Sequence, residues 1–248
     1  MEDGANGQTN LTRKERRAFA REEKKKGRGK EATFNKLKKL FTMAFGVFVL
    51  LFLGYKALKW INTPQPEVAG SAVEVVDSDW IRGKKDAKVT LIEYSDFQCP
   101  ACKQYQPILE NLIDEYADNL KIVYRHYPLF TIHKNAIPSA KASEAAGNQG
   151  KFWEMHDMLF EKQDEWSEEG IPMDKFVGYA KDLGLNEESF KNDYQSKDVE
   201  DKVNQDLTNG NSLRLTGTPT FYINGRKIEN PQGYEGLKKA VDNALKEN

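Results

Sequence analysis

The sequence has few residues of the kinds that bind metals through sulfur or imidazole. Its 248 residues include only two cysteines, Cys99 and Cys102, and three histidines, His126, His133 and His156. A structural zinc ion needs four ligands, and no histidine lies at a spacing typical of a zinc motif with the cysteine pair. We therefore expect no metal site, and we expect the histidines to be surface or packing residues.

Long hydrophobic runs are also lacking, with one exception. Hydrophobic residues make up 39% of the sequence, which is enough for a packed core but too little for several membrane spans. The exception, residues 40–61, has 22 residues and includes the uncharged stretch Leu40–Tyr55. A helix needs roughly 20 residues to cross a bilayer. Lys56 and Lys59 can extend to the headgroups and Trp60 suits the interface, so we predict a single N-terminal transmembrane helix over 40–61.

Two other interpretations of this hydrophobic segment stay open. One is a buried core helix, which rarely follows so basic a flank. The other is a cleaved signal peptide, whose basic region is short, whereas 39 residues precede the apolar stretch here. The only candidate cleavage site with small residues, Ala69–Ala72, lies far beyond that stretch. We therefore predict an uncleaved membrane anchor.

Charge is distributed unevenly around the hydrophobic segment. Residues 1–39 contain 13 Lys and Arg but only six Asp and Glu, whereas residues 62–248 contain 22 and 32. Because positive charge is retained on the cytoplasmic side, we expect the N-terminus in the cytoplasm and residues 62–248 outside it. The composition of the tail 1–39 is typical of disordered sequence. We expect this tail to orient the chain in the membrane and to bind no nucleic acid. Outside the cytoplasm a cysteine pair can stay oxidised.

The outer part is predicted to be one α/β domain behind a short linker. Two prolines in residues 62–70 indicate a stiff linker, so the domain covers residues 71–248. Apolar residues at helical spacing predict a helix after the cysteines, a helical block at about 138–212, and a C-terminal helix. Asn224-Gly225 predicts a hairpin turn. The predicted strands are Ala72–Val76, Lys88–Ser95, Lys121–Tyr124, Thr220–Ile223 and Arg226–Glu229.

The two cysteines are separated by two residues, a spacing that metal sites, disulfide staples and redox sites all use. A disulfide that closes so short a loop adds about 2 kcal/mol in the chain-entropy model, against about 3 kcal/mol for a fifteen-residue loop, so a staple here would do little for the domain. Cys99 follows a predicted strand and precedes a predicted helix, whose N-terminal N–H groups lower the pKa of a thiol. Pro100 suits the first helical turn. The pattern predicts Cys99 as the attacking thiolate and Cys102 as the shielded resolving thiol.

Two further features lie away from the cysteines in the sequence. Glu93 occurs in an apolar strand, where a carboxylate is costly unless it has a role, and it could take a proton from Cys102. The alternative is a solvated glutamate on an edge strand. Pro219 stands immediately before a strand, and a cis bond there would leave backbone groups free to pair with an extended peptide. The alternative is an ordinary trans proline in a turn.

These features together resemble the thioredoxin superfamily, and within it the DsbA-type thiol–disulfide oxidoreductases of bacterial envelopes. The resemblance covers roughly residues 75–248 and rests on Cys99-Pro100-Ala101-Cys102, Glu93, Pro107 in the first helix, Thr218-Pro219 and the helical block. It implies a thioredoxin-like α/β fold with an inserted, DsbA-like helical block, a cis bond before Pro219, and no cofactor. The implied site residues are catalytic Cys99, Cys102 and Glu93, with Thr218, Pro219, Pro100 and Ala101 binding substrate.

The resemblance implies a membrane-anchored enzyme that introduces disulfides into exported proteins by exchange with the Cys99–Cys102 pair. Its partners would be cysteine-containing exported proteins, a membrane quinone-linked thiol oxidoreductase as reoxidant, and the lipid bilayer through residues 40–61. The sequence departs from the best-known DsbA type at Ala101, where that type has histidine. We therefore expect a potential between about −120 mV, typical of DsbA, and about −270 mV, typical of thioredoxin.

Two other functions fit the same residues. One is a disulfide reductase or isomerase on the same fold, because the sequence does not fix the direction of electron flow. The other is a redox-silent adaptor that binds peptides in the groove beside Pro219. Substitution of Cys99 abolishes an enzyme of either direction but spares an adaptor.

Overall fold

The computed structural model describes residues 38–56, 73–170, 172–229 and 231–247. The chain divides into two compact units, Met1–Glu67 and Val68–Asn248. Three predicted segments lie wholly or partly outside the described residues. They are the tail 1–39 except for its last two residues, the end of the span 40–61, and the whole linker 62–70.

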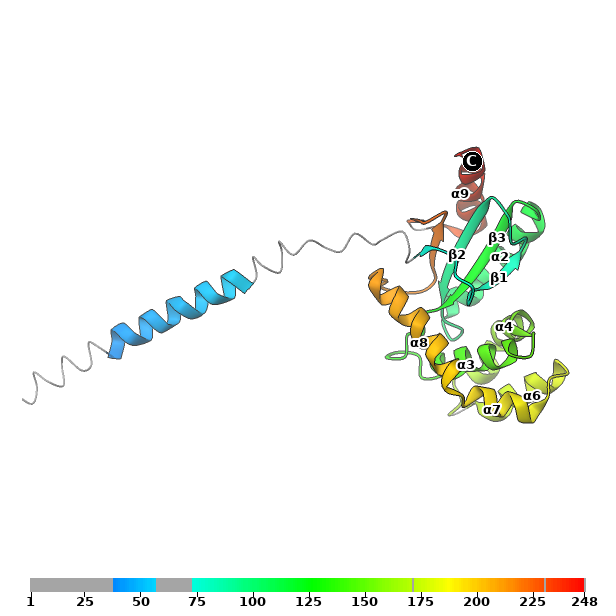
Figure 1. Ribbon diagram of the computed structural model, residues 1–248, viewed down its shortest axis with the longest axis horizontal. Coiled ribbons are helices and arrows are strands. Elements are labelled where there is room, and N and C mark those ends of the chain that lie inside the picture. Colours follow the sequence, from blue (N-terminus) through cyan, green and yellow to red (C-terminus); the bar gives the residue numbers. More distant parts are fainter. Residues whose placement is uncertain (1–37, 57–72, 171, 230, 248) are drawn as a thin grey trace, which may run out of the picture. The chain divides into compact units, whose positions relative to one another are not determined.

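The first unit contains the helix Lys38–Lys56, which is drawn in blue in Figure 1. Its 19 residues would extend about 28 Å at 1.5 Å per residue, close to the thickness of a bilayer core of about 30 Å. None of its most apolar window is buried, so a core helix is the wrong interpretation of the described segment. By length and composition the helix can cross a membrane, and these two properties also fit a signal sequence.

A five-stranded sheet forms the centre of the second unit, with the order β1-β3-β2-β4-β5. Strands β2 and β3 are parallel neighbours, and the other pairs are antiparallel. Nearly every residue of β2 and β3 is buried, as expected for central strands covered on both faces. The bounds are β1 Trp80–Gly83, β2 Val89–Ser95, β3 Leu120–His126, β4 Thr220–Ile223 and β5 Arg226–Lys227.

The predicted strand Ala72–Val76 is wrong over its described residues, because no strand lies at 73–76. The first strand is β1, which pairs with the outer edge of β3. The chain turns before it enters the sheet: the Asp79 N–H donates to the Val76 carbonyl, and the Val76 N–H donates to the Asp79 carboxylate at 2.9 Å. Val73, Val75 and Val76 therefore precede the sheet instead of joining it.

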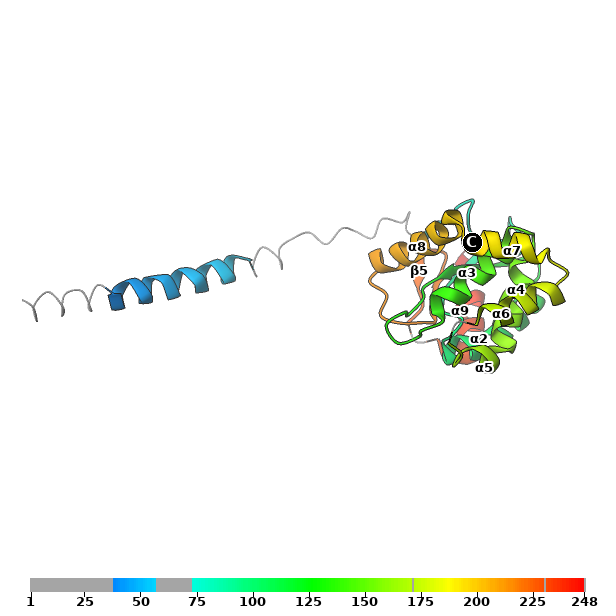
Figure 2. The same ribbon diagram turned by 90° about the horizontal axis from the view of Figure 1, so that it is seen from below.

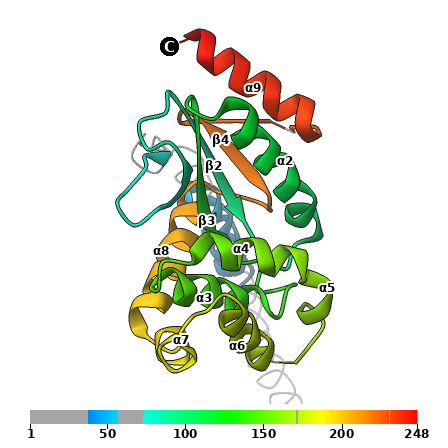
Figure 3. The same ribbon diagram turned by 90° about the vertical axis from the view of Figure 1, so that its right-hand side faces the viewer.

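Helices cover the sheet in two groups (Figure 3). Helices α2 (Pro100–Tyr116) and α9 (Gly233–Glu247) lie beside the strands, and they share a core with Leu91 of β2. The other helices come between β3 and β4 in sequence and gather beyond one end of β2 and β3; this block faces the viewer in Figure 2. They are α3 Ala136–Gly147, α4 Phe152–Glu161, α5 Gln163–Trp166, α6 Met173–Asp182, α7 Glu187–Tyr194 and α8 Lys197–Ser212.

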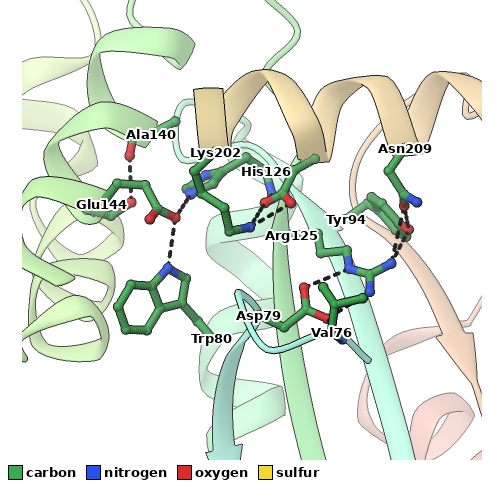
Figure 4. A network of polar contacts seen from close by, with 12 residues as sticks. Val76, Asp79, Trp80, Tyr94, Arg125, His126, Ala140, Glu144, Lys202 and Asn209 are labelled. Atoms are coloured by element: carbon green, nitrogen blue, oxygen red, sulfur yellow. Dashed lines mark hydrogen bonds and ion pairs between the residues drawn. The ribbon is translucent and has the colours of Figure 1, made fainter. Parts of the chain in front are cut away.

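Buried polar contacts attach this helical block to the sheet (Figure 4). Consecutive residues of β3 face opposite sides, so Arg125 and His126 reach different elements. Arg125 pairs with the Asp79 carboxylate at 2.7 Å, and His126 Nε2 lies 2.7 Å from Glu144 Oε1 of α3. The same Glu144 oxygen accepts a hydrogen bond from the Trp80 indole at 2.8 Å. The contacts give each buried charge a partner and fix the block against β1 and β3.

Candidate active site

Both cysteines lie where β2 leads into α2. Cys99 has extended backbone angles and directly precedes the helix, whose first residue is Pro100. The first hydrogen bond of the helix runs from the Lys103 N–H to the Cys99 carbonyl. Cys102 lies one turn into the helix and is fully buried, whereas Cys99 keeps 7% of its surface exposed. Both are free thiols, so the structure represents the reduced form.

The environment separates the acidities of the two thiols. Hydrogen bonding from the Cys102 thiol is the main cause that lowers the pKa of Cys99 to about 5; Thr218 and the N–H groups of Ala101 and Cys102 act in the same direction, against the effect of burial. Burial raises the pKa of Cys102 well above its usual value, and its bond to Cys99 adds to this. At neutral pH, Cys99 is therefore a thiolate and Cys102 a thiol.

A loop far along the sequence completes the rim of the site. Strand β4 pairs with β2 in the register Tyr94↔Thr220, and this places the preceding Thr218-Pro219 peptide beside the cysteines. That peptide bond is cis, as predicted. The Thr218 carbonyl oxygen lies 3.5 Å from Cys99 Sγ. Residues 216–221 also line a surface pocket of about 280 Å³ together with residues 227–229 and Pro231.

Glu93 lies on the central strand β2 and is 2% exposed, so the alternative of a solvated edge-strand glutamate is wrong. It shares a face of β2 with Leu91, the face that α2 covers. Burial is the main cause that raises the pKa of Glu93 to about 8. Its charge in turn raises the pKa of Cys102. Glu93 is therefore protonated at neutral pH and can exchange a proton with its surroundings near that pH.

The geometry brings the predicted site residues together from three parts of the chain. Glu93 comes from β2, Cys99 and Cys102 from the start of α2, and Thr218 and Pro219 from the loop before β4. The two residues between the cysteines lie at the rim, with Pro100 exposed and Ala101 partly buried. In the described ranges no three His, Cys, Asp or Glu side chains are grouped as metal ligands.

Comparison with known proteins identifies the family. The family model described as "Thioredoxin" matches residues 76–243. The chain belongs to the thioredoxin family. A relative within it is the "Probable disulfide bond formation protein D" of Bacillus cereus, which is 33% identical over 209 residues, or 82% of this chain and 95% of that protein.

Solved structures of thioredoxin-family proteins match the second unit. BdbD from Bacillus subtilis in its oxidised form is 27% identical, with a TM-score of 0.61 over 67% of this chain and 92% of that one. The fold is also that of alpha-DsbA1 from Wolbachia pipientis, with 18% identity and a TM-score of 0.64 over 72% and 96% of the two chains. The chain thus has the predicted fold with an inserted helical block, and it shares this fold with alpha-DsbA1.

Other relatives are larger proteins. The "Na(+)/H(+) antiporter NhaA 1" of Salinispora arenicola is 38% identical over 169 residues, which are 68% of this chain but 25% of the antiporter. The chain therefore spans about a quarter of the length of the curated relatives that match it first.

In this thioredoxin-family chain, buried amide side chains hold the backbone around Cys99. Gln163 of α5 is 4% exposed, and its Nε2 donates to the carbonyls of Phe97 at 2.7 Å and Cys99 at 3.2 Å. The Gln98 amide accepts from the Asn135 N–H at 2.6 Å. Sequence reasoning missed these residues, because an isolated glutamine in a polar stretch gives no sign of burial.

A second missed feature is the contact between Asp96 and His133. Asp96 is buried three residues before Cys99, and its carboxylate accepts from the Gln98 N–H at 2.8 Å and the Leu129 N–H at 2.9 Å. His133 Nδ1 lies 2.7 Å from the same carboxylate. The segment that carries Cys99 is therefore fixed on the side of the loop after β3 as well as on the side of α5.

Proposed function

We propose that the second unit is an extracytoplasmic thiol–disulfide oxidoreductase that introduces disulfides into exported proteins through Cys99 and Cys102. The observation that carries the proposal is the acidic thiol of Cys99, which lies at a helix N-terminus with its sulfur 3.5 Å from the Thr218 carbonyl oxygen. The relative named for disulfide bond formation supports it. The helix Lys38–Lys56 would anchor the domain to the bacterial cell membrane with the N-terminus in the cytoplasm.

The cycle starts from the Cys99–Cys102 disulfide. A substrate thiolate attacks the Cys99 sulfur, and Cys102 leaves as a thiolate that takes a proton from Glu93. The substrate's second thiolate then attacks the substrate sulfur that is bonded to Cys99 in the mixed disulfide. The substrate disulfide forms, and Cys99 leaves as a thiolate. The substrate loses two electrons, and the cysteine pair gains them. The low pKa of Cys99 favours this direction, because it makes Cys99 a good leaving group and stabilises the reduced form.

Substrate and reoxidant would meet the same rim. An extended substrate segment would lie along Thr218 and Pro219, with Pro100 and Ala101 on the other side of the thiolate. Reoxidation needs an electron acceptor, and we assign a membrane quinone-linked thiol oxidoreductase to this role. Attachment to the membrane would hold this chain and its reoxidant at the same membrane surface and raise their effective concentration for each other.

The equilibrium potential of the cysteine pair tests the direction of electron flow. The full-length chain in detergent is equilibrated with glutathione or dithiothreitol buffers, and the free thiols are alkylated and counted by mass. The pKa of Cys99, about 5, lies between about 3.5 for DsbA and about 7 for thioredoxin, so we expect a potential between those of the two proteins. A value near about −270 mV would instead favour the reductase.

Two serine variants separate an enzyme from an adaptor. Cys99→Ser should abolish oxidation of a reduced, unfolded protein, whereas Cys102→Ser should trap a mixed disulfide on Cys99. Peptide binding that survives in Cys99→Ser, together with a wild-type chain that oxidises and reduces nothing, would overturn the proposed function.

A further inference from the structure

Three buried hydroxyls near the cysteine pair have no hydrogen-bond partner of standard distance and angle among the described residues. Ser95 and Thr218 nevertheless lie close enough to neighbouring acidic groups to lower the pKa values of those groups. In the part of the chain that the structure describes, the buried side-chain nitrogen and oxygen atoms without a partner are Ser95 Oγ, Tyr124 Oη and Thr218 Oγ1. Ser95 and Tyr124 are almost completely buried. Native structures keep few such groups, and each one needs an explanation. Here Ser95 and Thr218 belong to segments that build the site, and Tyr124 lies on the neighbouring strand β3 in one buried cluster with Cys99 and Cys102.

The strand geometry places Ser95 on the same face of β2 as the buried acid. Ser95 and Glu93 are two residues apart on β2, so their side chains share the face that α2 covers. Tyr124 is the register partner of Glu93 on β3 and packs in one buried cluster with Cys99 and Cys102. One small hydroxyl therefore occupies the same buried region as the carboxyl group, the phenol and the resolving thiol.

The electrostatic interactions of these groups support this placement. The Ser95 hydroxyl lowers the pKa of Glu93 and of Cys102, and it also lowers that of Tyr124. The charge of Glu93 raises the pKa of Cys102, whereas the hydroxyl group of Ser95 lowers the pKa of both Glu93 and Cys102. A serine hydroxyl can donate and accept at the same time, and it rotates to suit its partners. Ser95 thus has the chemistry of a proton carrier between the two.

We propose that the Ser95 hydroxyl carries the proton that Glu93 and Cys102 exchange; this step rests on the proposed function. When Cys102 leaves the disulfide as a thiolate, Ser95 donates its hydroxyl proton to Cys102 Sγ and accepts the Glu93 carboxyl proton on Oγ. Glu93 ends this step as a carboxylate, Cys102 ends as a thiol, and Ser95 is unchanged. Glu93 then takes up a proton from solvent at neutral pH, because its pKa is raised to about 8. When Cys102 attacks a mixed disulfide, the same protons move in reverse in those chains whose Glu93 is a carboxylate, and Glu93 is reprotonated. The test is therefore run at about pH 8, where about half of Glu93 is ionised.

The test follows resolution of a mixed disulfide, the step in which Cys102 loses its proton. The reduced full-length chain in detergent is mixed with oxidised glutathione, quenched in acid at short times and alkylated, and the adduct on Cys99 is measured by mass. We expect the adduct to resolve about 10-fold more slowly in Ser95→Ala, and roughly 100-fold more slowly in Glu93→Gln, which removes the base itself. The double variant should be no slower than Glu93→Gln.

Three further measurements distinguish proton transfer from packing. Ser95→Thr keeps the hydroxyl and should retain most of the wild-type rate. The defect of Ser95→Ala should shrink as the pH rises, because hydroxide then takes the proton. The matched control is Ser143→Ala, since the Ser143 hydroxyl is equally buried but donates to the Ala140 carbonyl at 2.8 Å, and it should resolve at the wild-type rate.

Several results would overturn the proposal. Effects of Ser95→Ala and Glu93→Gln that multiply in the double variant would show that the two residues act independently. A Ser95→Ala defect that does not change with pH would show a packing role. A normal rate in Ser95→Ala with a slow Tyr124→Phe would assign the transfer to Tyr124. A wild-type chain that forms no adduct on Cys99 would overturn the proposed function itself.

Discussion

At the scale of single residues, the site depends on opposite shifts in acidity within a small buried volume. Cys99 is more acidic than a free thiol because it can accept hydrogen bonds at the start of α2. Cys102 and Glu93 are less acidic because they are buried close to each other and to that thiolate. The reduced form thus stores one negative charge on Cys99 and one proton on Glu93 at neutral pH.

Substitution of Glu93 should change how stability depends on pH in the reduced protein. The raised pKa of Glu93 means that, between its ordinary 4.5 and about 8, the folded chain holds a proton that the unfolded chain has lost, so stability falls as pH rises. The lowered pKa of Cys99 has the opposite effect between about 5 and its ordinary 9. In Glu93→Gln only the second effect remains, so stability should increase with pH.

This change can be measured by urea unfolding of the reduced full-length chain in detergent, followed by tryptophan fluorescence, at about pH 5.5 and pH 7.5. Glu235→Gln, at an exposed position of α9, is the control and should behave as the wild type. A Glu93→Gln variant whose stability falls between the two pH values contradicts the assigned protonation states.

At the scale of elements, the inserted helices reach into the active site. Gln163 of α5 holds the carbonyls on both sides of Gln98, and the amide of Gln98 reaches back to the Ser167 carbonyl at 2.7 Å. On the other side of the sheet, Arg125 of β3 joins the turn before β1 to α8 through Asp79 and Asn209. The block therefore positions the backbone around Cys99 as well as covering the core.

Removal of the Gln163 amide should affect both stability and reactivity. Gln163→Leu leaves two buried carbonyls without this donor, which should cost about 1–3 kcal/mol. Because the Cys99 carbonyl is then less firmly held, the pKa of Cys99 should rise, which is measurable as a shift in the pH dependence of alkylation by iodoacetamide. The control Gln104→Leu lies on the exposed face of α2 and should change stability by less than about 0.5 kcal/mol. An unchanged alkylation profile in Gln163→Leu contradicts a positioning role.

The buried ion pair beside β1 should matter far more than a similar pair on the surface. Asp79→Ala removes the carboxylate that neutralises Arg125 and should cost about 3–5 kcal/mol in denaturant unfolding. Asp164→Ala removes an 89% exposed partner of Lys103 and should cost about 0–1 kcal/mol. Equal losses in the two variants would mean that burial of the pair has no energetic consequence.

At the scale of the whole molecule, an apolar helix and a thioredoxin-family domain form two separate units of one chain. The helix Lys38–Lys56 exposes its apolar side chains, which only a membrane or another apolar partner can cover. The cysteine pair lies entirely within the second unit. The proposed function needs both units, because the first determines where the second acts.

Membrane attachment is expected to depend on the centre of this helix. Leu50→Lys places a charge in the apolar stretch at a cost of about 2.5–3.5 kcal/mol for insertion, so a larger fraction of the chain should be extracted by alkaline carbonate. Leu50→Ile is the control and should remain in the membrane fraction. A mature wild-type product that has lost the N-terminal part including this helix would instead identify a signal sequence.

Patterns that act within a few residues were predictable from the sequence. The spacing of Cys99 and Cys102 and the proline between them set the start of α2. Asn224 and Gly225 both have positive φ angles, as the predicted hairpin turn between β4 and β5 requires. The uncharged run at Leu40–Tyr55 predicted a helix in the first unit. Each of these features depends on near neighbours, so the local sequence determines it.

Only the tertiary structure decided which groups are buried and what they face. The sequence placed a carboxylate in a strand, but the central position of β2 is what raises the pKa of Glu93. It gave no sign of Gln163, which holds Cys99 across 64 positions, or of the turn at Asp79 that moved the first strand to Trp80–Gly83. Burial and hydrogen bonding arise from contacts between distant segments, and these contacts form only when the whole domain folds.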